Sequence, residues 1–229
     1  MDGFLIFALV AGVVIVLAIV GAIKQSQRRK ELLAWAAAKG LHFSQEHIGG
    51  LDARFPAFSC LRQGDNRYAY NTISGDWNGR RLFGFDYHYA THSTDSKGRR
   101  RTHHHHFSAV ILDSDLPLKP LFLRPEGFFD KVTEFFGADD IDFESAEFSR
   151  KFYVKAPDRR WAFDVIHQRT MEFLLARPQY SMQFDLGCVM AWTGGVFSVA
   201  QFANAADTIA GVLDRLPEYV KRQQAGAVI

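Results

Sequence analysis

The chain has 229 residues, of which 48% are hydrophobic, and its 27 lysines and arginines nearly balance 25 aspartates and glutamates. This composition excludes a disordered chain, and its length fits one domain of ordinary size beside a short additional segment. A net charge of +2 is too small to indicate nucleic acid as a partner. Cys60 and Cys188 do not indicate a disulfide-dependent fold, and we expect both thiols to be reduced and buried.

An uncharged apolar stretch lies next to the N-terminus. Residues 3–23 read GFLIFALVAGVVIVLAIVGAI and, as a helix, would span about 31 Å, which matches the hydrocarbon core of a bilayer. We therefore predict a transmembrane helix over 3–23, with the lipid bilayer as its partner. A cleaved signal peptide is the alternative, but no basic residue precedes the stretch, which exceeds the usual length of a signal-peptide core.

Cations crowd only the downstream end of this stretch. Asp2 alone precedes it, whereas four cations follow directly: Lys24, Arg28, Arg29 and Lys30. The positive-inside rule then predicts a single-pass protein of the cell membrane, with the N-terminus outside and the C-terminal domain in the cytoplasm. Residues 24–40 have strong helix formers and a C-cap glycine at Gly40, so we expect a basic juxtamembrane helix that can continue the membrane helix as a stiff stalk.

The next part of the chain has the pattern of antiparallel strands. Asn78-Gly79 separates two strand-like runs over 68–77 and 80–90, which is the strongest short signal for a β-hairpin. Residues 82–89 alternate so that one face is aromatic and buried and the other is mostly polar. After a polar loop over 92–102, residues 107–112 indicate a third strand. These runs predict a β-meander.

Helical patterns dominate the rest of the chain. In order, we predict a helix over 128–136, a strand over 148–154, a helix capped by Asp158 that stops before Pro178, a strand over 180–192, and a helix that begins with a Ser198/Gln201 capping box and ends at Pro217. Strands come in runs, so the expected fold is α+β, with an N-terminal transmembrane helix followed by one domain whose antiparallel β-meander sheet is backed by helices. We expect this soluble domain over 41–222 and a flexible tail over 223–229.

Histidine is the most unusual residue in its distribution. Six of the nine histidines lie between His88 and His106. On a strand, His104 and His106 would share a face, and His88 on the neighbouring strand could join them as an open zinc site. The alternative is a solvated edge beside Arg99, Arg100 and Arg101, whose charge disfavours a bound cation. We favour the metal-free reading, with these three histidines as the candidate ligands if a metal is bound.

Other patterns do not indicate a catalytic or cofactor-binding site. The acidic stretch from Asp139 to Glu147 fails the EF-hand template, because Ser145 and Lys151 stand where glycine and glutamate are needed. It indicates an edge strand with one wet face instead. The chain has no nucleophile elbow and no phosphate-binding loop. Two basic clusters, at 24–30 and 97–101, could attract anionic lipid head groups.

Four segments together resemble a group of bacterial single-pass membrane proteins that share a domain of unknown function. They are FGFDYHY, SAVIL, LFLRPEGFFDKV and IDFESAEFSRKFYVKAPD, which follow an N-terminal membrane helix. The resemblance covers most of residues 3–220, and its motifs are structural. It implies an anchored domain and no active site.

The function predicted from the sequence is a membrane-anchored cytoplasmic binding or scaffolding domain with an unknown protein partner. Whether the chain is an enzyme stays open, although the lack of a convergent catalytic set favours a non-enzymatic role. The alternatives are a metal-dependent hydrolase at the membrane that uses His88, His104 and His106, and a sensor of anionic lipid surfaces that uses the two basic clusters.

Overall fold

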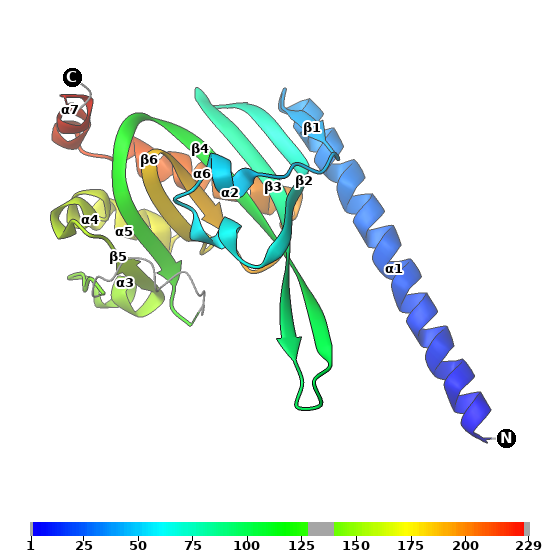
Figure 1. Ribbon diagram of the computed structural model, residues 1–229. Coiled ribbons are helices and arrows are strands. Elements are labelled where there is room, and N and C mark those ends of the chain that lie inside the picture. Colours follow the sequence, from blue (N-terminus) through cyan, green and yellow to red (C-terminus); the bar gives the residue numbers. More distant parts are fainter. Residues whose placement is uncertain (1, 128–139, 227–229) are drawn as a thin grey trace.

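The computed structural model describes residues 2–127 and 140–226, and its first element is the long helix α1 (Asp2–Ala38). This helix has 37 residues without a break, so the predicted membrane and juxtamembrane helices form one rod (Figure 1). Among the described residues it is the one helix long and apolar enough to cross a membrane, with a mean hydropathy of 2.1 over an 18-residue window. Its large apolar side chains from Phe7 to Ile23 are exposed, as a lipid-facing surface requires. Gly40 follows with φ +67°, the left-handed conformation of a C-cap glycine.

The described residues form a six-stranded antiparallel sheet. Its strands are β1 (His42–Ser44), β2 (Asp65–Trp77), β3 (Arg80–Thr94), β4 (Arg100–Pro125), β5 (Phe152–Lys155) and β6 (Ser181–Trp192). β1 to β4 pair in chain order, and the long strand β4 also pairs with β5 and β6. The β2–β3 hairpin turns at Asn78 and Gly79, both with positive φ, as the sequence predicts. The predicted α+β fold with a β-meander is confirmed.

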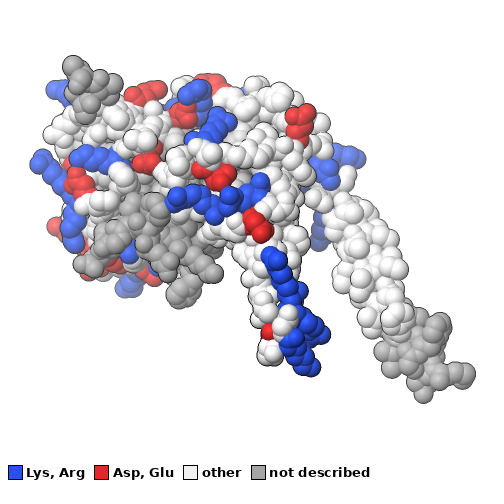
Figure 2. All heavy atoms as spheres, in the orientation of Figure 1, with Lys and Arg blue, Asp and Glu red and all other residues white. Residues whose placement is uncertain are grey.

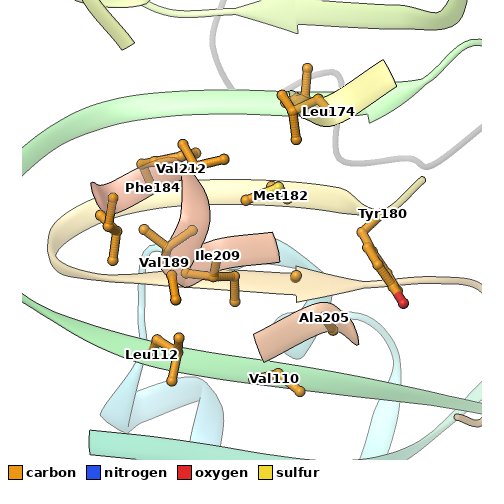
Figure 3. Close-up of a cluster of buried hydrophobic side chains, with 14 of the residues drawn as sticks. Val110, Leu112, Leu174, Tyr180, Met182, Phe184, Val189, Ala205, Ile209 and Val212 are labelled. Atoms are coloured by element: carbon orange, nitrogen blue, oxygen red, sulfur yellow. The ribbon is translucent and has the colours of Figure 1, made fainter. Parts of the chain in front are cut away.

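One face of the sheet is covered by α6 (Val199–Asp214) and by the C-terminal half of α1. The apolar stripe of α6, with Ala205, Ile209 and Val212, packs on the inward side chains of β4 and β6, as Figure 3 shows. Gly84 of β3 makes room for this helix, because a Cβ there would lie 3.2 Å from the ring of Phe202. The helix α6 therefore packs closely against a position without a side chain.

The other face is covered by the segment that holds α2 (Leu51–Arg54) and the 3-10 helix η1 (Ser59–Arg62). Its apolar side chains pack on the aromatic face of β3, where Phe85 and Tyr87 are 0% and 1% exposed. Tyr87 also donates its hydroxyl to the carbonyl of Leu61 at 2.7 Å. The sheet is thus the middle of three layers, with a separate hydrophobic cluster on each side.

The remaining helices lie beyond the sheet edge: α3 (Ala146–Lys151), α4 (Arg159–Val165), α5 (Gln168–Leu175) and α7 (Glu218–Gly226). Asp158 caps α4 as predicted and accepts from the Trp161 amide at 3.1 Å. The single helix predicted after Asp158 is wrong, because Ile166 leaves helical geometry and α5 starts anew after His167. Ile166 is 1% exposed, so the break keeps it in the core.

Several other predicted boundaries also differ. The strand predicted over 148–154 is helix α3 up to Lys151 and strand only from Phe152. The predicted edge strand after Asp139 is also wrong, because residues 140–144 form an irregular segment with Ile141 buried. α7 continues to Gly226, so residues 223–226 of the expected tail are helical. The predicted helix over 128–136 and the end of the tail, 227–229, lie outside the described residues.

One expectation about the hairpin of β3 and β4 is wrong, and one of its polar faces is buried. The polar loop predicted over 92–102 is only the turn at 95–99, because both strands extend and pair as far as Thr94 and Arg100. The face of β3 predicted to be mostly polar does carry polar side chains, but they are buried: Asp86 and His88 are 0% and 3% exposed. Both side chains are covered by elements distant in sequence, described below.

The capping box of α6 gives a prediction for stability. Ser198 accepts from the Gln201 amide at 3.3 Å, and the Gln201 side chain accepts from the Ser198 amide at 2.8 Å. Replacing Ser198 with alanine should lower the free energy of unfolding by about 1 kcal/mol, because the Gln201 amide at the start of α6 loses its side-chain acceptor. Urea denaturation of the full chain in detergent micelles measures this, with Ser198→Thr as the control that keeps a cap. A loss in the threonine variant equal to that in the alanine variant would contradict a capping role.

Candidate functional site

The part of α1 that follows the predicted membrane segment, residues 24–38, is called the stalk below. It is bound to the sheet through a buried carboxylate. Arg28 of α1 donates from Nη1 and Nη2 to the two carboxylate oxygens of Asp86 at 2.7 and 2.8 Å. The Asp86 side chain is fully buried, and Arg28 is 19% exposed. A two-pronged arginine–carboxylate contact fixes orientation as well as distance. One residue just beyond the predicted membrane segment is therefore held by the middle of β3.

Further donors complete the shell around this carboxylate. Asn71 of β2 donates its amide to Asp86 at 2.8 Å, and the Ser108 hydroxyl of β4 donates to the other oxygen. Asn71 has φ +47° at an irregularity of the β2–β3 register, which lets its short side chain face inward. With Arg28, donors from α1, β2 and β4 meet on one acid of β3. We call Arg28, Asn71, Asp86 and Ser108 the stalk lock.

The stalk lock also reaches the segment that leads into α6. The Phe197 amide donates to Ser108 Oγ at 2.8 Å, and Arg28 Nε donates to the Phe197 carbonyl at 2.6 Å. Further along α1 toward its C-terminal end, Leu32 and Ala36 are fully buried. There Trp35 packs against Trp77 with ring centroids 5.8 Å apart. The stalk is therefore held by polar contacts at one level and apolar contacts at the next, which fixes its direction relative to the sheet.

Beyond the stalk lock, the same face of the sheet carries a stack of rings. His47, Tyr68, His88 and His104 follow one another with centroid separations of 4.3, 4.6 and 5.2 Å. His106 lies 4.8 Å from His88. The prediction that His104 and His106 share a face with His88 is thus confirmed in position. We call these five residues the ring ladder.

Three histidines of the ring ladder form hydrogen bonds through their ring nitrogens. His88 Nδ1 donates to the Asn66 carbonyl at 3.0 Å, and its Nε2 lies 3.0 Å from His104 Nδ1. His106 Nδ1 lies 3.0 Å from the Tyr70 hydroxyl. Because both nitrogens of His88 have partners, this residue has no free lone pair for a metal ion. Among residues 2–127 and 140–226, no three His, Cys, Asp or Glu side chains are arranged to hold a metal.

The ring ladder gives a prediction for pH. Partial burial, and then the charges of His88 and His104, lower the pKa of His106 from its ordinary value of 6.5. The unfolded chain then binds a proton on this residue more readily than the folded chain. His106 should therefore contribute full stability above pH 6.5 and progressively less as the pH falls below that value.

Urea denaturation of the full chain in micelles at several pH values between 8 and about 5 tests this. The variant His106→Gln should lose less stability on acidification than the wild type. The control is His42→Gln, because His42 is exposed on β1, away from the ring ladder. An identical dependence on pH in His106→Gln and wild type would contradict the assignment.

The other histidines of this hairpin contact residues on neighbouring strands. His105 stacks on Tyr89 with centroids 4.6 Å apart and contacts the Thr91 hydroxyl at 2.8 Å. His103 contacts the Ser93 hydroxyl at 2.8 Å. His92 contacts the Asp65 carboxylate at 2.8 Å. The histidine run is thus a set of cross-strand contacts that stiffen the hairpin.

The end of this hairpin projects from the sheet. Beyond Ala90, the last residue of β3 that pairs with β2, residues 91–103 form a two-stranded extension that we call the finger. Its turn is built on Asp95, which accepts from the amides of Lys97 and Arg99 at 2.9 Å each. These bonds, first that from the Arg99 amide, lower the pKa of Asp95. Gly98 completes the turn with φ +77°.

The finger carries a group of positive charges that faces solvent. Figure 2 shows blue spheres gathered at its tip and along the side that faces α1 in this view. They belong to Lys97, Arg99, Arg100 and Arg101, all exposed, and Asp95 is the one acid among residues 91–103. In Figure 1 the finger projects toward the same side of the molecule as the N-terminal half of α1. The basic surface of the finger therefore points in the same direction as the apolar N-terminal segment of α1.

One edge of β4 stays open above the finger. β6 pairs with β4 only from Ala109 onward, and the Ser108 amide donates sideways to the Gly195 carbonyl at 3.0 Å. Because backbone groups alternate along a strand, those of His106 and His104 point toward the same edge, which no strand of the described residues covers. A cavity of about 350 Å³ lies beside it and is lined by Gln63, Tyr89, His105, Trp192 and neighbouring residues.

The remaining candidate residues carry no reactive arrangement. Cys60 and Cys188 form no disulfide, and Cys60 is buried. Cys188 is only partly buried rather than fully so, and desolvation raises the pKa of its thiol to about 12, which suppresses the reactive thiolate. Within the basic stretch 24–30, Arg28 is bound to Asp86 and Arg29 donates to Gln45 at 3.1 Å, so Lys24 and Lys30 are the residues of this cluster best placed for lipid.

Comparison with known proteins shows the fold. No family model matches the chain, and no curated protein matches it. Among solved structures, it is similar to the mycobacterial trehalose monomycolate transport factor A, TtfA, with a TM-score of 0.58 and 14% sequence identity. The match covers 82% of this chain and 93% of that one. The similarity therefore extends over most of both chains.

Proposed function

We propose that the chain is a membrane-anchored binding or scaffolding domain that faces the cytoplasm, with its N-terminus outside. The cations that follow residues 3–23 support this orientation through the positive-inside rule. Lys24 and Lys30 would lie at the level of anionic lipid head groups. The fold neighbour is a transport factor, and this supports a role in binding rather than in catalysis.

The stalk lock is the observation that carries this proposal. A tether that only keeps a domain near a membrane needs no fixed angle, and a flexible linker serves that purpose. Here Arg28 and Asp86 hold the domain to a rigid helix at a defined angle, at the cost of burying a charged pair. Such an arrangement presents the same surface to the same membrane neighbour at all times, as a scaffold requires.

The open edge of β4 and the cavity beside it form the surface that we assign to a protein partner. An extended segment of the partner would add to the edge at His104 and His106 through main-chain hydrogen bonds. The cavity lined by Gln63 and Trp192 would receive one of its side chains.

A photocrosslinking pulldown from native membranes tests the proposal. A photoreactive amino acid in place of Gln63 should yield a discrete protein adduct, whereas one in place of Arg159, exposed on α4, should not. The same adduct from both positions, or none from Gln63 in intact membranes, would overturn the assignment of this surface. Digestion of the domain by a protease added outside intact cells would overturn the orientation.

A further inference from the structure

We propose that a small cavity between α1 and the sheet binds a phosphate group. The cavity has a volume of about 230 Å³ and lies at the start of the stalk, where Gln25 and Arg29 line it. We call it the Arg29 cavity. Binding of phosphate there goes beyond the proposed function, because it requires neither the cytoplasmic orientation nor a protein partner. Four features support it: the segments that form the cavity, its charge, its donors and its size.

The Arg29 cavity lies beside an irregularity of the sheet edge. Ser44, the last residue of β1, pairs with Thr72 of β2. The next pairing point, an isolated bridge, joins Ile48 to Ala69, so residues 45–47 lie opposite only two residues of β2. This offset of one residue interrupts the ladder as a β-bulge does. The side chains that line the cavity come from the bulge, β2, β4 and α1, and include Gln45, His47, Tyr68, Tyr70, His106 and Arg29.

The Arg29 cavity has a positive charge that no acid balances. Among residues 2–127 and 140–226, no aspartate or glutamate lines it. The neighbouring cation, Arg28, is paired with Asp86, whereas the side chain of Arg29 donates to the uncharged Gln45. The charge of Arg29 is therefore left for an external anion, and it disfavours a bound cation.

Arg29 also has a donor that the protein does not use. Its Nε is buried and has no hydrogen-bond partner within the described ranges, while Nη1 donates to Gln45 at 3.1 Å. A buried donor without a partner costs free energy, and an oxyanion would supply the missing acceptor.

Uncharged donors come from the other walls of the Arg29 cavity. Gln25 of α1, His47 of the bulge and Tyr68 of β2 line it, and none of these three side chains forms a hydrogen bond in the part of the chain that the structure describes. His47 and Tyr68 instead stack on each other with ring centroids 4.3 Å apart. Donors from three segments suit a tetrahedral phosphate, whose oxygens point in several directions, better than a planar carboxylate.

The size of the Arg29 cavity limits the ligand to a small group. Sites for drug-sized ligands have volumes of about 300–1,000 Å³, so this cavity is too small for a nucleotide. A soluble phosphate monoester and the head group of phosphatidic acid carry the same small dianion. Both sources can reach the site, since Gln25 lies just beyond the predicted membrane segment and is exposed.

Isothermal titration calorimetry of the full-length protein tests the inference, in micelles of an uncharged maltoside detergent and a buffer free of phosphate. Inorganic phosphate, added at constant ionic strength, should bind saturably with one site per chain. Arg29→Gln should weaken this binding about tenfold or more, because a charged donor is lost. The matched control, Lys30→Gln, removes the exposed cation at the next position of α1 and should change the affinity by less than about twofold.

A second variant keeps Arg29 in place. Gln25→Glu puts a carboxylate four residues before Arg29 on the same face of α1, where it competes with phosphate for the guanidinium. This variant should also weaken the binding of phosphate. It decides the question even where Arg29→Gln fails to show the wild-type circular dichroism spectrum.

Competition with two further probes identifies the source of the phosphate. Glycerol 3-phosphate carries the group in soluble form, and dilauroyl phosphatidic acid carries it in the micelle. Displacement of inorganic phosphate by the lipid at much lower total concentration assigns the site to a lipid head group. Displacement by glycerol 3-phosphate at the same concentration as by the lipid assigns it to a soluble monoester.

Three outcomes would overturn the inference and leave the anchor and the protein partner unaffected. One is the absence of saturable heat up to about 10 mM phosphate, where a site of millimolar affinity is mostly filled. Another is acetate that binds as tightly as phosphate, since the site then does not select a tetrahedral anion. The third is an equal loss of affinity in Lys30→Gln and Arg29→Gln, because the effect then belongs to the overall charge of α1.

Discussion

Replacing Arg28 with alanine is expected to lower the free energy of unfolding by about 3–5 kcal/mol. The reason is the environment of its partner, since Asp86 is fully buried and would keep a charge without a counterion. Asn71 and Ser108 would still donate to the carboxylate, but neither carries charge. Urea denaturation of the full chain in micelles, followed by circular dichroism, measures the loss.

Two comparisons separate the stalk lock from a general effect of charge on α1. Lys30→Ala removes a cation two residues further along the same helix, where the side chain is exposed, and should cost less than about 0.5 kcal/mol. In Arg28→Ala/Asp86→Ala the loss should be clearly smaller than the sum of the two single losses, because the charges are removed together. Additive losses would contradict a direct coupling between the two residues.

Replacing Gly64 with alanine should have the second large effect, about 3–4 kcal/mol. Gly64 precedes β2 with φ +58°, and a Cβ there would lie 2.0 Å from the carbonyl oxygen of Ala90. Ala90 is the residue of β3 that marks the base of the finger. Because the contact is with backbone, β3 has to move away from β2 to relieve it.

The matched control for this substitution is Gly79→Ala in the β2–β3 turn. Gly79 also has positive φ, at +81°, but nothing lies within 4 Å of its Cβ position. It should therefore show only the conformational cost, about 1 kcal/mol. Thermal or urea denaturation of the two variants gives the difference directly. Similar losses at both glycines would mean that the approach of Gly64 to Ala90 contributes little.

The sequence predicts well those features that nearby residues determine. The turn at Asn78 and Gly79, the cap at Asp158 and the capping box of Ser198 each depend on residues within four positions of one another. The apolar stretch over 3–23 likewise needs no partner to be recognised. These signals identify the elements and the α+β class before any tertiary contact is known.

The stalk lock could not be predicted in this way, because its partners are far apart in the chain. Arg28 and Asp86 are separated by 58 residues. The positive-inside rule explains Arg28 without reference to a partner, and the alternation of β3 assigns Asp86 only to a mostly polar face. One signal was present, since Asp86 is the one acid within FGFDYHY, a strand otherwise suited to a core. A lone acid there indicates a buried partner.

Within the histidine run, the sequence predicts which side chains share a face but not the hydrogen-bond partners of their ring nitrogens. Alternation correctly places His104 and His106 on one face, and the observed register brings His88 opposite His106. Whether such imidazoles bind a metal depends on their other nitrogens. Those of His88 are engaged by Asn66 and His104, and a carbonyl 22 residues away is not visible in a sequence pattern.

The central claim, that the stalk and the finger are held in one fixed relation, is tested most directly by pulsed electron paramagnetic resonance. Spin labels at Lys24→Cys on α1 and Ser96→Cys on the finger would be placed in the full-length protein in lipid nanodiscs. A single narrow distribution of distances is expected, which should broaden when Arg28→Ala is added. A broad distribution in the protein with an intact stalk lock would contradict the account.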